Sequence, residues 1–262
     1  MTRIELVRAP NPGPFTGPGT NSYVIASGVE ALVLDPGPVI PEHLDAIRVA
    51  LTGLTPVGVV VTHTHPDHAP AANGLGVEFD VPVFGFDAGD DFDPTDWLED
   101  GSPIGFGSDQ LVTVHTPGHT ADHVCFRLGE YLFTGDHIMG GSTVIIEDAS
   151  AYMNSLEKVA ALDPAHLYPG HGPELPEARQ VIAEYIAHRI EREQQVLAAL
   201  GEGAANLGDI VDVVYIGLDP SLRMAATMQV HTQLIKLQSE GRVSLGLGGV
   251  HGATTVELVE RP

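Results

Sequence analysis

A histidine-rich stretch, VVVTHTHPDHAP at residues 59–70, constrains what this chain can fold into more than any other feature. Three histidines and an aspartate lie within six positions, directly after a valine run that indicates a buried strand. Every imidazole removed from water needs a hydrogen-bond partner, so a strand end has no structural use for three of them. A metal ion would use them. The stretch therefore predicts a metal-binding turn after a buried strand.

The segments around this stretch indicate a layered α/β body. ALVLDPG at 31–37 is typical of a strand that ends in a turn, and Leu44, Ile47 and Leu51 have helical spacing after Pro41. Further strands are expected at 81–86, 110–116, 123–129, 131–135 and 166–172, with a helix at 151–162. Helices and strands that mix in this way, without an internal repeat, favour a layered α/β architecture with mixed sheets.

From Pro176 onward the pattern becomes helical. Residues 176–200 place Ile182, Ile186 and Ile190 four apart, which predicts a long helix. Two more helices are expected at 207–217 and 221–241, followed by strands at 242–247 and 254–259 around a glycine-rich turn. Helix, helix, hairpin is the order of a winged helix. We therefore predict a catalytic domain over 1–178 and a linking helix with a winged-helix-like domain over 179–262.

The net charge of −23 is unevenly distributed. Residues 1–178 hold five Lys and Arg against 25 Asp and Glu, net −20, whereas residues 179–262 hold seven against ten, net −3. An acidic body opposes non-specific attachment to nucleic acid and to anionic membranes. No apolar run reaches the roughly 18 residues of a membrane span, and the single cysteine, Cys125, excludes an internal disulfide. We expect a cytoplasmic protein that does not bind membranes.

Candidate metal ligands occur in four separate motifs. Beyond the first cluster, His119 lies in TPGHT, Asp136 in TGDH and His171 in PGHG, each at a predicted strand end beside glycine or proline. Five imidazoles and two carboxylates suit Zn²⁺, with Mn²⁺ or Fe²⁺ as alternatives. Seven ligands exceed the four of a closed structural zinc site, so we expect two divalent metal ions with an open position for water. Two cations would depress the pKa of that water toward neutrality.

The chain resembles a known family in these motifs. The metallo-β-lactamase fold hydrolases carry similar motifs in the same order as THTHPDH, TPGHT, TGDH and PGHG here. A closer likeness, to the β-lactamase-like protein 2 branch of single-stranded-RNA endonucleases, extends over NPGPFTGPGTNSY, EDASAYMNSL, YPGHGPE, HRIEREQQVL and the winged-helix tail. The resemblance implies an αββα sandwich with two metals in a cleft at one edge.

The resemblance also implies a role for each ligand. The first metal would be held by His63, His65 and His119, the second by Asp67, His68 and His171, and Asp136 would bridge them. A metal-bound hydroxide would attack the substrate, and Asp67 would be the catalytic residue that orients it. Some positions depart from the relatives, which often carry tryptophan at Thr64 and cysteine at His137. True β-lactamases of the commonest subclass have a cysteine ligand at Asp136, which argues against that activity.

Five further residues are candidates for supporting the metals or touching substrate. Asp35 is expected to hydrogen-bond the metal loop, with turn capping as the alternative. Asn21 and Tyr23 either line the cleft or serve a turn and the core. His123 and His137 either support the ligands or are ordinary buried histidines. The other histidines, among them His231, have no partner spacing and are expected to be ordinary.

Three functions are compatible with the sequence. The first is hydrolysis of phosphodiesters in single-stranded RNA, which the full-length resemblance implies and which we take as the substrate prediction. The second is an acyl hydrolase of thioesters, esters or lactones of the glyoxalase II type, which the acidic charge and the lack of clustered aromatic residues favour. The third is a metal-sensing winged-helix protein. Only Arg223 and Lys236 are cations on its recognition-helix candidate, so specific DNA binding is not expected. The tail is expected instead to pack beside the active-site cleft, where it either narrows the cleft or mediates the contacts of a homodimer.

Overall fold

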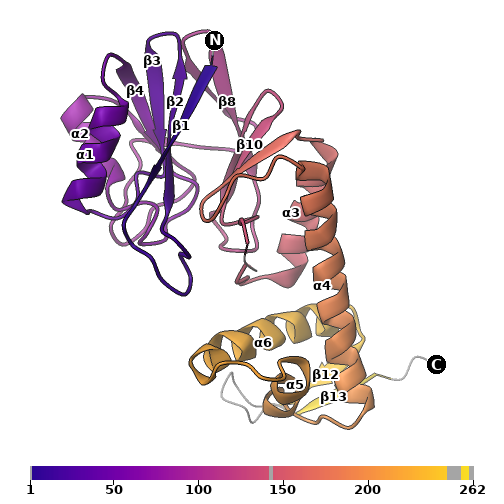
Figure 1. Ribbon diagram of the computed structural model, residues 1–262. Coiled ribbons are helices and arrows are strands. Elements are labelled where there is room, and N and C mark those ends of the chain that lie inside the picture. The colour runs from indigo at the N-terminus through magenta and orange to yellow at the C-terminus, as the bar shows by residue number, and fades with distance from the viewer. Residues whose placement is uncertain (1, 142–143, 247–254, 260–262) are drawn as a thin grey trace.

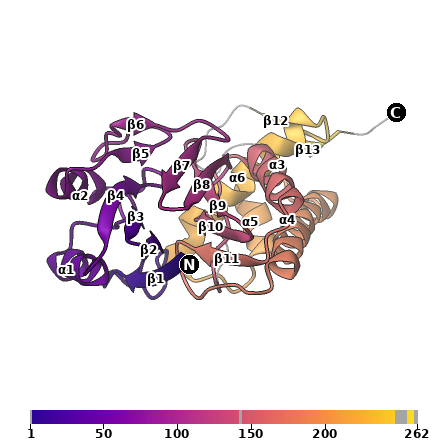
Figure 2. The ribbon, with the colours of Figure 1, turned by 90° about the horizontal axis from the view of Figure 1, so that it is seen from above.

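The body of the protein is a four-layered sandwich, and a smaller tail lies below it (Figure 1). The computed structural model describes residues 2–141, 144–246 and 255–259. Seen from above, the order of layers is helices, sheet, sheet, helices (Figure 2). The predicted αββα architecture and the winged-helix order of the tail are confirmed.

The first sheet has six strands in sequence order and is mixed. Its strands are β1 (Thr2–Arg8), β2 (Asn21–Ser27), β3 (Glu30–Leu34), β4 (Thr55–Val60), β5 (Val83–Gly85) and β6 (Asp96–Trp97). The first three pair antiparallel, and β3 to β6 run parallel. The helices α1 (Pro41–Ala50) and α2 (Ala72–Phe79) cover its outer face (Figure 2).

The second sheet has five strands in the order β11, β10, β9, β8, β7. These are β7 (Pro103–Phe106), β8 (Asp109–His115), β9 (Val124–Leu128), β10 (Tyr131–Gly135) and β11 (His166–Pro169). Only β10 and β11 pair in parallel. Their connection is α3 (Ala149–Ala161), which covers the outer face together with the long α4 (Ala178–Gly201).

Strand β2, most of β3 and the valines at the end of β4 are buried on both faces. In β2, for example, Val24 packs toward α1 and α2, whereas Ile25 packs toward the second sheet with Phe126 and Phe133. Successive side chains of a strand point to opposite faces, so a strand covered on both sides must be apolar at every position. This requirement explains the uninterrupted valine run that precedes the histidine cluster.

The tail has its own hydrophobic core. It contains α5 (Leu207–Val214), the short helix η1 (Pro220–Leu222), α6 (Arg223–Ser239) and the antiparallel pair β12 (Val243–Leu245) and β13 (Val256–Leu258). The turn predicted between the last two strands lies outside the described residues. Within α4, Ile182 packs in the body and Val196 in the tail core. The helix therefore belongs to both units, and the boundary at 178/179 stays a prediction.

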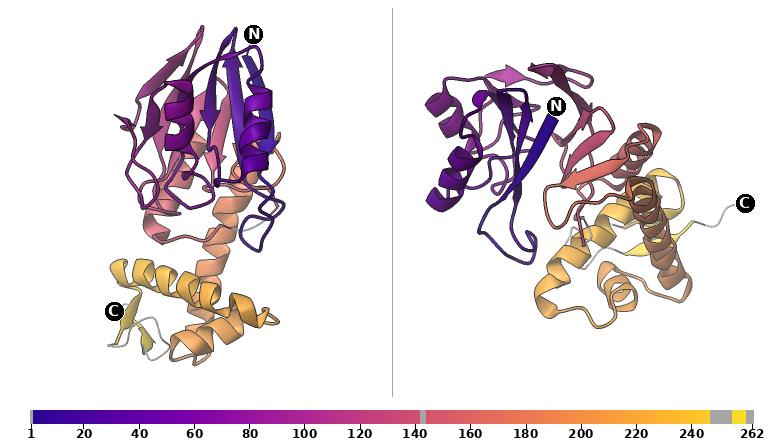
Figure 3. Two further views of the ribbon diagram at one scale, coloured as in Figure 1. Left: turned by 90° about the vertical axis from the view of Figure 1, so that its left-hand side faces the viewer. Right: turned by 45° about the horizontal axis from the view of Figure 1, so that its top comes forward.

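The tail lies under the edge of the sandwich that carries the loops after β4, β10 and β11. The views in Figure 3 show α6 crossing below the two sheets, at the end opposite the outer hairpins. The loops after β4, β10 and β11 open toward this edge. None of the helices in the described ranges is long and apolar enough to cross a membrane.

Candidate metal centre

Seven side chains from both sheets converge at this edge. The loop after β4 carries His63, His65, Asp67 and His68, while the loops before β9, after β10 and after β11 carry His119, Asp136 and His171. In parallel or mixed sheets the loops at one edge are brought together by the sheet itself. The seven ligands proposed from the sequence are thus neighbours, in two groups whose ligand atoms lie within 4.8 Å of one another.

The first group contains three histidines and Asp136. His63 Nε2 lies 2.9 Å from His65 Nδ1, and His119 Nε2 lies 3.1 Å from the same His65 nitrogen. Three ring nitrogens therefore meet at one point, and they cannot all carry a proton. Because burial and the neighbouring His68 and His119 disfavour its charged form, the pKa of His63 is held well below its usual value. Neutral imidazoles are the form that binds metals.

The second group contains Asp67, His68 and His171. His171 Nε2 lies 3.1 Å from Asp67 Oδ2 and 3.3 Å from His68 Nε2. His68 Nε2 lies 3.4 Å from Asp67 Oδ2. Two nitrogens and one carboxylate oxygen thus face a common point, at which these residues would hold a second divalent ion.

Asp136 reaches both groups with its two oxygens. Oδ2 lies 3.7 Å from His119 Nε2, and Oδ1 lies 3.3 Å from His171 Nε2 and 3.4 Å from His68 Nε2. Burial alone would raise the pKa of this carboxyl, but the charge of His68 and the hydrogen bond from His171 outweigh it and hold the pKa well below its usual range. An ionised carboxylate between two groups of imidazoles has the position of a bridging ligand.

The outer nitrogens of four histidines are anchored to oxygen atoms. His119 Nδ1 donates to the carbonyl of Ile145 at 2.6 Å, and His171 Nδ1 to the carbonyl of Gly19 at 3.4 Å. His68 Nδ1 lies 3.0 Å from Asp35 Oδ2, and His63 Nδ1 lies 3.0 Å from Thr62 Oγ1. A donated Nδ1 proton leaves the Nε2 lone pair directed at the centre, which is the arrangement that holds metal-bound histidines in place. The residues present therefore fit two divalent ions.

Asp35 organises the loop after β4. Its Oδ1 accepts the backbone N–H of Thr62 at 2.7 Å, and its Oδ2 accepts the Thr62 hydroxyl at 2.8 Å in addition to His68. Because the Thr62 hydroxyl donates to Asp35, its oxygen is free to accept from His63. One buried carboxylate thus orients a ligand of each group, at the cost of a left-handed backbone with φ of 47°.

Asn21 and Tyr23 support the loop that carries His171 and do not line the cleft. Asn21 Nδ2 donates to the carbonyls of Pro169 and Gly172 at 2.9 and 3.0 Å, and the Tyr23 hydroxyl donates to the Pro169 carbonyl at 2.8 Å. Both side chains are buried. Of the two alternatives left open for this pair, the structure shows core positions that hold a turn.

His123 and His137 are both fully buried beside the ligands. His123 Nε2 accepts the backbone N–H of Asp136 at 3.1 Å, and its Nδ1 lies 3.0 Å from Thr116 Oγ1. It therefore braces the loop of the bridging carboxylate. His137 packs against Tyr152, with ring centroids 4.8 Å apart. Neither residue lines the cavity at the metal centre, so we find no route from either ring to a substrate in the described structure.

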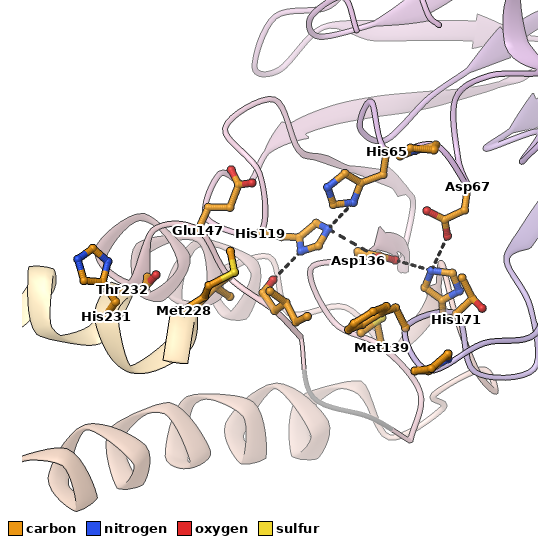
Figure 4. A pocket seen from close by; sticks show the side chains of 16 residues that line it. His65, Asp67, His119, Asp136, Met139, Glu147, His171, Met228, His231 and Thr232 are labelled. Atoms are coloured by element: carbon orange, nitrogen blue, oxygen red, sulfur yellow. Dashed lines mark hydrogen bonds and ion pairs between the residues drawn. The ribbon is translucent and has the colours of Figure 1, made fainter. Parts of the chain in front are cut away.

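A cavity of about 530 Å³ opens onto the metal centre, and helix α6 of the tail forms one of its walls (Figure 4). Met228, His231 and Thr232 line the cavity on the side of α6, across from the ligands. His231, expected to be an ordinary histidine, is thus among the residues that line the cavity. Apolar side chains form much of the remaining wall, namely Pro14, Phe15, Pro66, Met139, Ile145 and Ile146.

Three supporting residues carry no signal in the sequence. Thr20 Oγ1 donates to Asp67 Oδ2 at 2.9 Å. Gln229 of α6 bonds both backbone groups of Ile146, with its Nε2 3.0 Å from the carbonyl and its Oε1 3.3 Å from the N–H. The adjacent Ile145 carbonyl anchors His119. Thr20 lies in a glycine-rich segment, and its role follows only from its spatial neighbours in the fold. The carbonyl of Ile145 is a backbone group that every residue type has, so no residue type indicates its role.

The chain is similar to known families in both its body and its tail. A family model described as the metallo-beta-lactamase superfamily matches residues 15–171, which include all seven converging side chains. The chain belongs to the metallo-beta-lactamase superfamily. A second model, the beta-lactamase associated winged helix domain, matches residues 207–245 of the tail. Members of this superfamily with this constellation are hydrolases, so the prediction of a metallohydrolase is confirmed at this level.

Similar proteins extend over most of the chain. A protein named beta-lactamase-like protein 2 homolog from Caenorhabditis elegans is 34% identical and covers 92% of this chain and 85% of its own length. An atrochrysone carboxyl ACP thioesterase from Aspergillus chevalieri is 33% identical, with 94% and 84% covered. The crystal structure of a metallo-beta-lactamase family protein from Thermus thermophilus shares the fold with a TM-score of 0.80, at 20% identity and 98% coverage of both chains.

Proposed function

We propose that this metallo-beta-lactamase superfamily hydrolase cleaves acyl thioesters that carry an apolar acyl group. One observation carries the proposal: the cavity at the ligands is walled by apolar side chains, and no Lys or Arg of the described residues lines it. Phe15, Met139, Ile145 and Met228 offer apolar surface to an acyl group next to the metal centre. A phosphodiester would bring a negative charge to each nucleotide without a cation to meet it there.

The residues assign the chemistry as follows. His63, His65 and His119 would hold one metal ion, Asp67, His68 and His171 the other, and Asp136 both. The metal ions, when bound, supply a nucleophilic hydroxide at neutral pH and polarise the carbonyl of the substrate. Asp67 accepts a hydrogen bond from Thr20 on the oxygen that faces His171, so its carboxylate is held in the orientation needed to position the nucleophile. The metal identity stays a prediction, with Zn²⁺ first and Mn²⁺ or Fe²⁺ as alternatives.

Single-stranded RNA, our substrate prediction from the sequence, stays an alternative that the structure does not favour. Among the tail cations that could contact phosphate, three are paired with carboxylates: Arg223 with Asp212, and Lys236 and Arg242 with Glu193. The other two, Arg189 and Arg192, line a neighbouring cavity and not the one at the ligands. A nuclease groove needs free cations and stacking aromatic rings. The same pairs count against DNA binding by the tail, because groove binding needs unpaired cations on the recognition helix.

The experiment assays the metal-loaded protein in parallel on fluorescent single-stranded RNA and on a panel of acyl thioesters of increasing acyl length. We expect thioester turnover whose kcat/KM rises with acyl length, and its loss in Asp136→Ala and His119→Ala. Bound metal, measured by elemental analysis, should fall below two per chain in both variants. Asp163→Ala, which alters an exposed carboxylate paired with Arg179, is the matched control. RNA cleavage that Asp136→Ala removes, without thioester turnover, would overturn the proposal.

A further inference from the structure

A second cavity adjoins the one at the metal centre. It has a volume of about 210 Å³ and lies between α4, the end of α5 and the start of α6. It shares Pro14, Phe15 and Ile145 with the first cavity, so these side chains form the ridge between the two. Unlike the first cavity, it is lined by arginines, namely Arg189 and Arg192 of α4, beside His188.

These basic groups lack the carboxylate partners that most Lys and Arg of this acidic chain have. Of the 12 Lys and Arg in the sequence, those that form ion pairs with carboxylates in the described ranges are Arg3, Arg48, Lys158, Arg179, Arg223, Lys236 and Arg242. Neither Arg189 nor Arg192 forms such a pair within the described residues. With 35 Asp and Glu in the chain, two neighbouring arginines that lack a carboxylate partner there mark a local region of positive potential.

Arg192 retains donors for a ligand. Its Nη1 bonds the Gln195 side chain at 2.9 Å and the Val214 carbonyl at 3.3 Å, and its guanidinium lies 4.5 Å from the centre of the Tyr215 ring. A guanidinium has five N–H donors in a planar fork, and those on Nε and Nη2 have no hydrogen-bond partner among the described residues. The contacts thus fix the direction of the Arg192 side chain, and its Nε and Nη2 donors remain available for a ligand.

Arg189 and His188 add to the same potential. Arg189 is buried, holds the Val144 carbonyl at 2.6 Å, and has an Nε without a hydrogen-bond partner in the described part of the chain. The pKa of His188 is lowered by partial burial and by the charges of Arg189 and Arg192, which outweigh Glu191. After burial, the charges of the two arginines are the next causes of this lowered pKa.

We infer that this second cavity binds an anionic group on the thiol side of the substrate, a phosphate or a carboxylate, with Arg192 as its main ligand. The inference rests on the proposed thioesterase function and deepens it. A thioester has two sides: the apolar cavity accepts the acyl side at the metals, and the thiol arm passes Phe15 and Ile145 into the basic cavity. A charged contact on the thiol side of the reacting carbonyl selects the carrier of the acyl group and not the acyl group itself.

The test compares thioesters that share one acyl group and differ in the thiol: N-acetylcysteamine, pantetheine, 4′-phosphopantetheine and glutathione. For the wild type we expect the phosphorylated or the glutathione ester to exceed the neutral pantetheine ester in kcat/KM, and the preferred anion identifies the source. Arg192→Gln should lower this anionic-to-neutral ratio about tenfold, because a charge-assisted hydrogen bond is worth roughly that factor. Arg192→Lys should restore part of the ratio, whereas Arg179→Gln should leave it unchanged.

A binding measurement separates this inference from the proposed function. Calorimetry with free 4′-phosphopantetheine and free glutathione needs no turnover, and the favoured compound should bind the wild type more tightly than Arg192→Gln. If no thioester is hydrolysed but this difference in affinity is found, the proposed function fails and the anion site stands. If thioesters are hydrolysed with the same anionic-to-neutral ratio in the wild type and in Arg192→Gln, the anion site is overturned and the proposed function stands.

Discussion

Among the single residues around the metal centre, Asp35 connects the most ligands. Its two oxygens hold the Thr62 backbone, the Thr62 hydroxyl and His68, and the same hydroxyl accepts from His63. The sequence predicts that Asp35 bonds the metal loop, and the contacts are of that kind. What the carboxylate contributes beyond packing is the choice of tautomer, because only an acceptor at this position keeps the proton of His68 on Nδ1.

We predict that Asp35→Asn lowers the affinity of the second metal position by roughly 10- to 100-fold, the usual effect of losing such an outer hydrogen bond. The new amide can turn an N–H toward His68, which drives the imidazole proton to Nε2, where the metal should bind. The measurement is the metal content per chain after dialysis against buffered metal. Asp109→Asn, which alters a half-buried carboxylate that accepts from Thr2, is the control. Two metals bound with wild-type affinity in Asp35→Asn would show that the orientation does not depend on this carboxylate.

Among the elements, α6 of the tail lies beside the metal centre, as expected of the tail from the sequence. It forms a wall of the cavity with Met228, His231 and Thr232, and Gln229 binds both backbone groups of Ile146. The preceding carbonyl along the loop, that of Ile145, holds His119. In the described structure, the winged helix therefore supports the loop of Ile145 and Ile146, which in turn holds His119.

Gln229→Ala should loosen this loop and, with it, His119. We expect the unfolding free energy to fall by about 2 kcal/mol, since two hydrogen bonds are lost, and metal to dissociate faster from the three-histidine group. The visible spectrum of the Co²⁺-substituted protein reports the geometry of that group and would not change through a loss of stability alone. Gln238→Ala, an exposed position on the same helix, is the matched control. An unchanged Co²⁺ spectrum and metal dissociation rate would mean that the loop is held without α6.

The elements also show where sequence patterns reach their limit. The long helix, the winged-helix helices and the buried strands followed from periodicity, which depends only on neighbours in the chain. Helix α2 was not expected, because its sequence ANGLGVEF contains two glycines. The structure explains one of them: a Cβ at Gly76 would lie 2.3 Å from Val83 Cγ2, so the close packing of α2 on β5 requires glycine. This requirement depends on a tertiary contact and is invisible in the local pattern.

At the scale of the whole molecule, the metal centre joins the two halves of the sandwich. The ligands His63, His65, Asp67 and His68 follow a strand of the first sheet, whereas His119, Asp136 and His171 come from the second. Metal ions that bind only the folded state stabilise it by mass action, by about 2.7 kcal/mol when the free metal is at a hundred times its dissociation constant. Removal of metal is therefore expected to lower the unfolding temperature.

The size of this loss should depend on pH in a definite direction. Burial lowers the pKa of His171 in the metal-free protein, but hydrogen bonds to Asp136 and Asp67 outweigh burial and raise the pKa to about 9. The ion pairs of protonated His171 thus stabilise the metal-free fold fully below its ordinary pKa of 6.5, and this contribution is lost as pH rises through 9. Metal binding requires neutral His171 and strengthens over the same window. We expect the gap in unfolding temperature between metal-bound and chelator-treated protein to widen across this window. A gap that narrows would show that another group controls the titration.

By itself, the sequence determined the ordered strands and helices, the winged-helix tail and the seven converging side chains, because these depend on local periodicity and on motifs in which the chemistry lies in the side chain. The tertiary structure decided the rest. The anchors of His119 and His171 are backbone carbonyls, and carbonyls are identical in every residue type. The apolar cavity, its α6 wall and the basic cavity around Arg192 arise from segments far apart in the chain. Only folding determines which arginines meet a carboxylate and which remain available for a ligand.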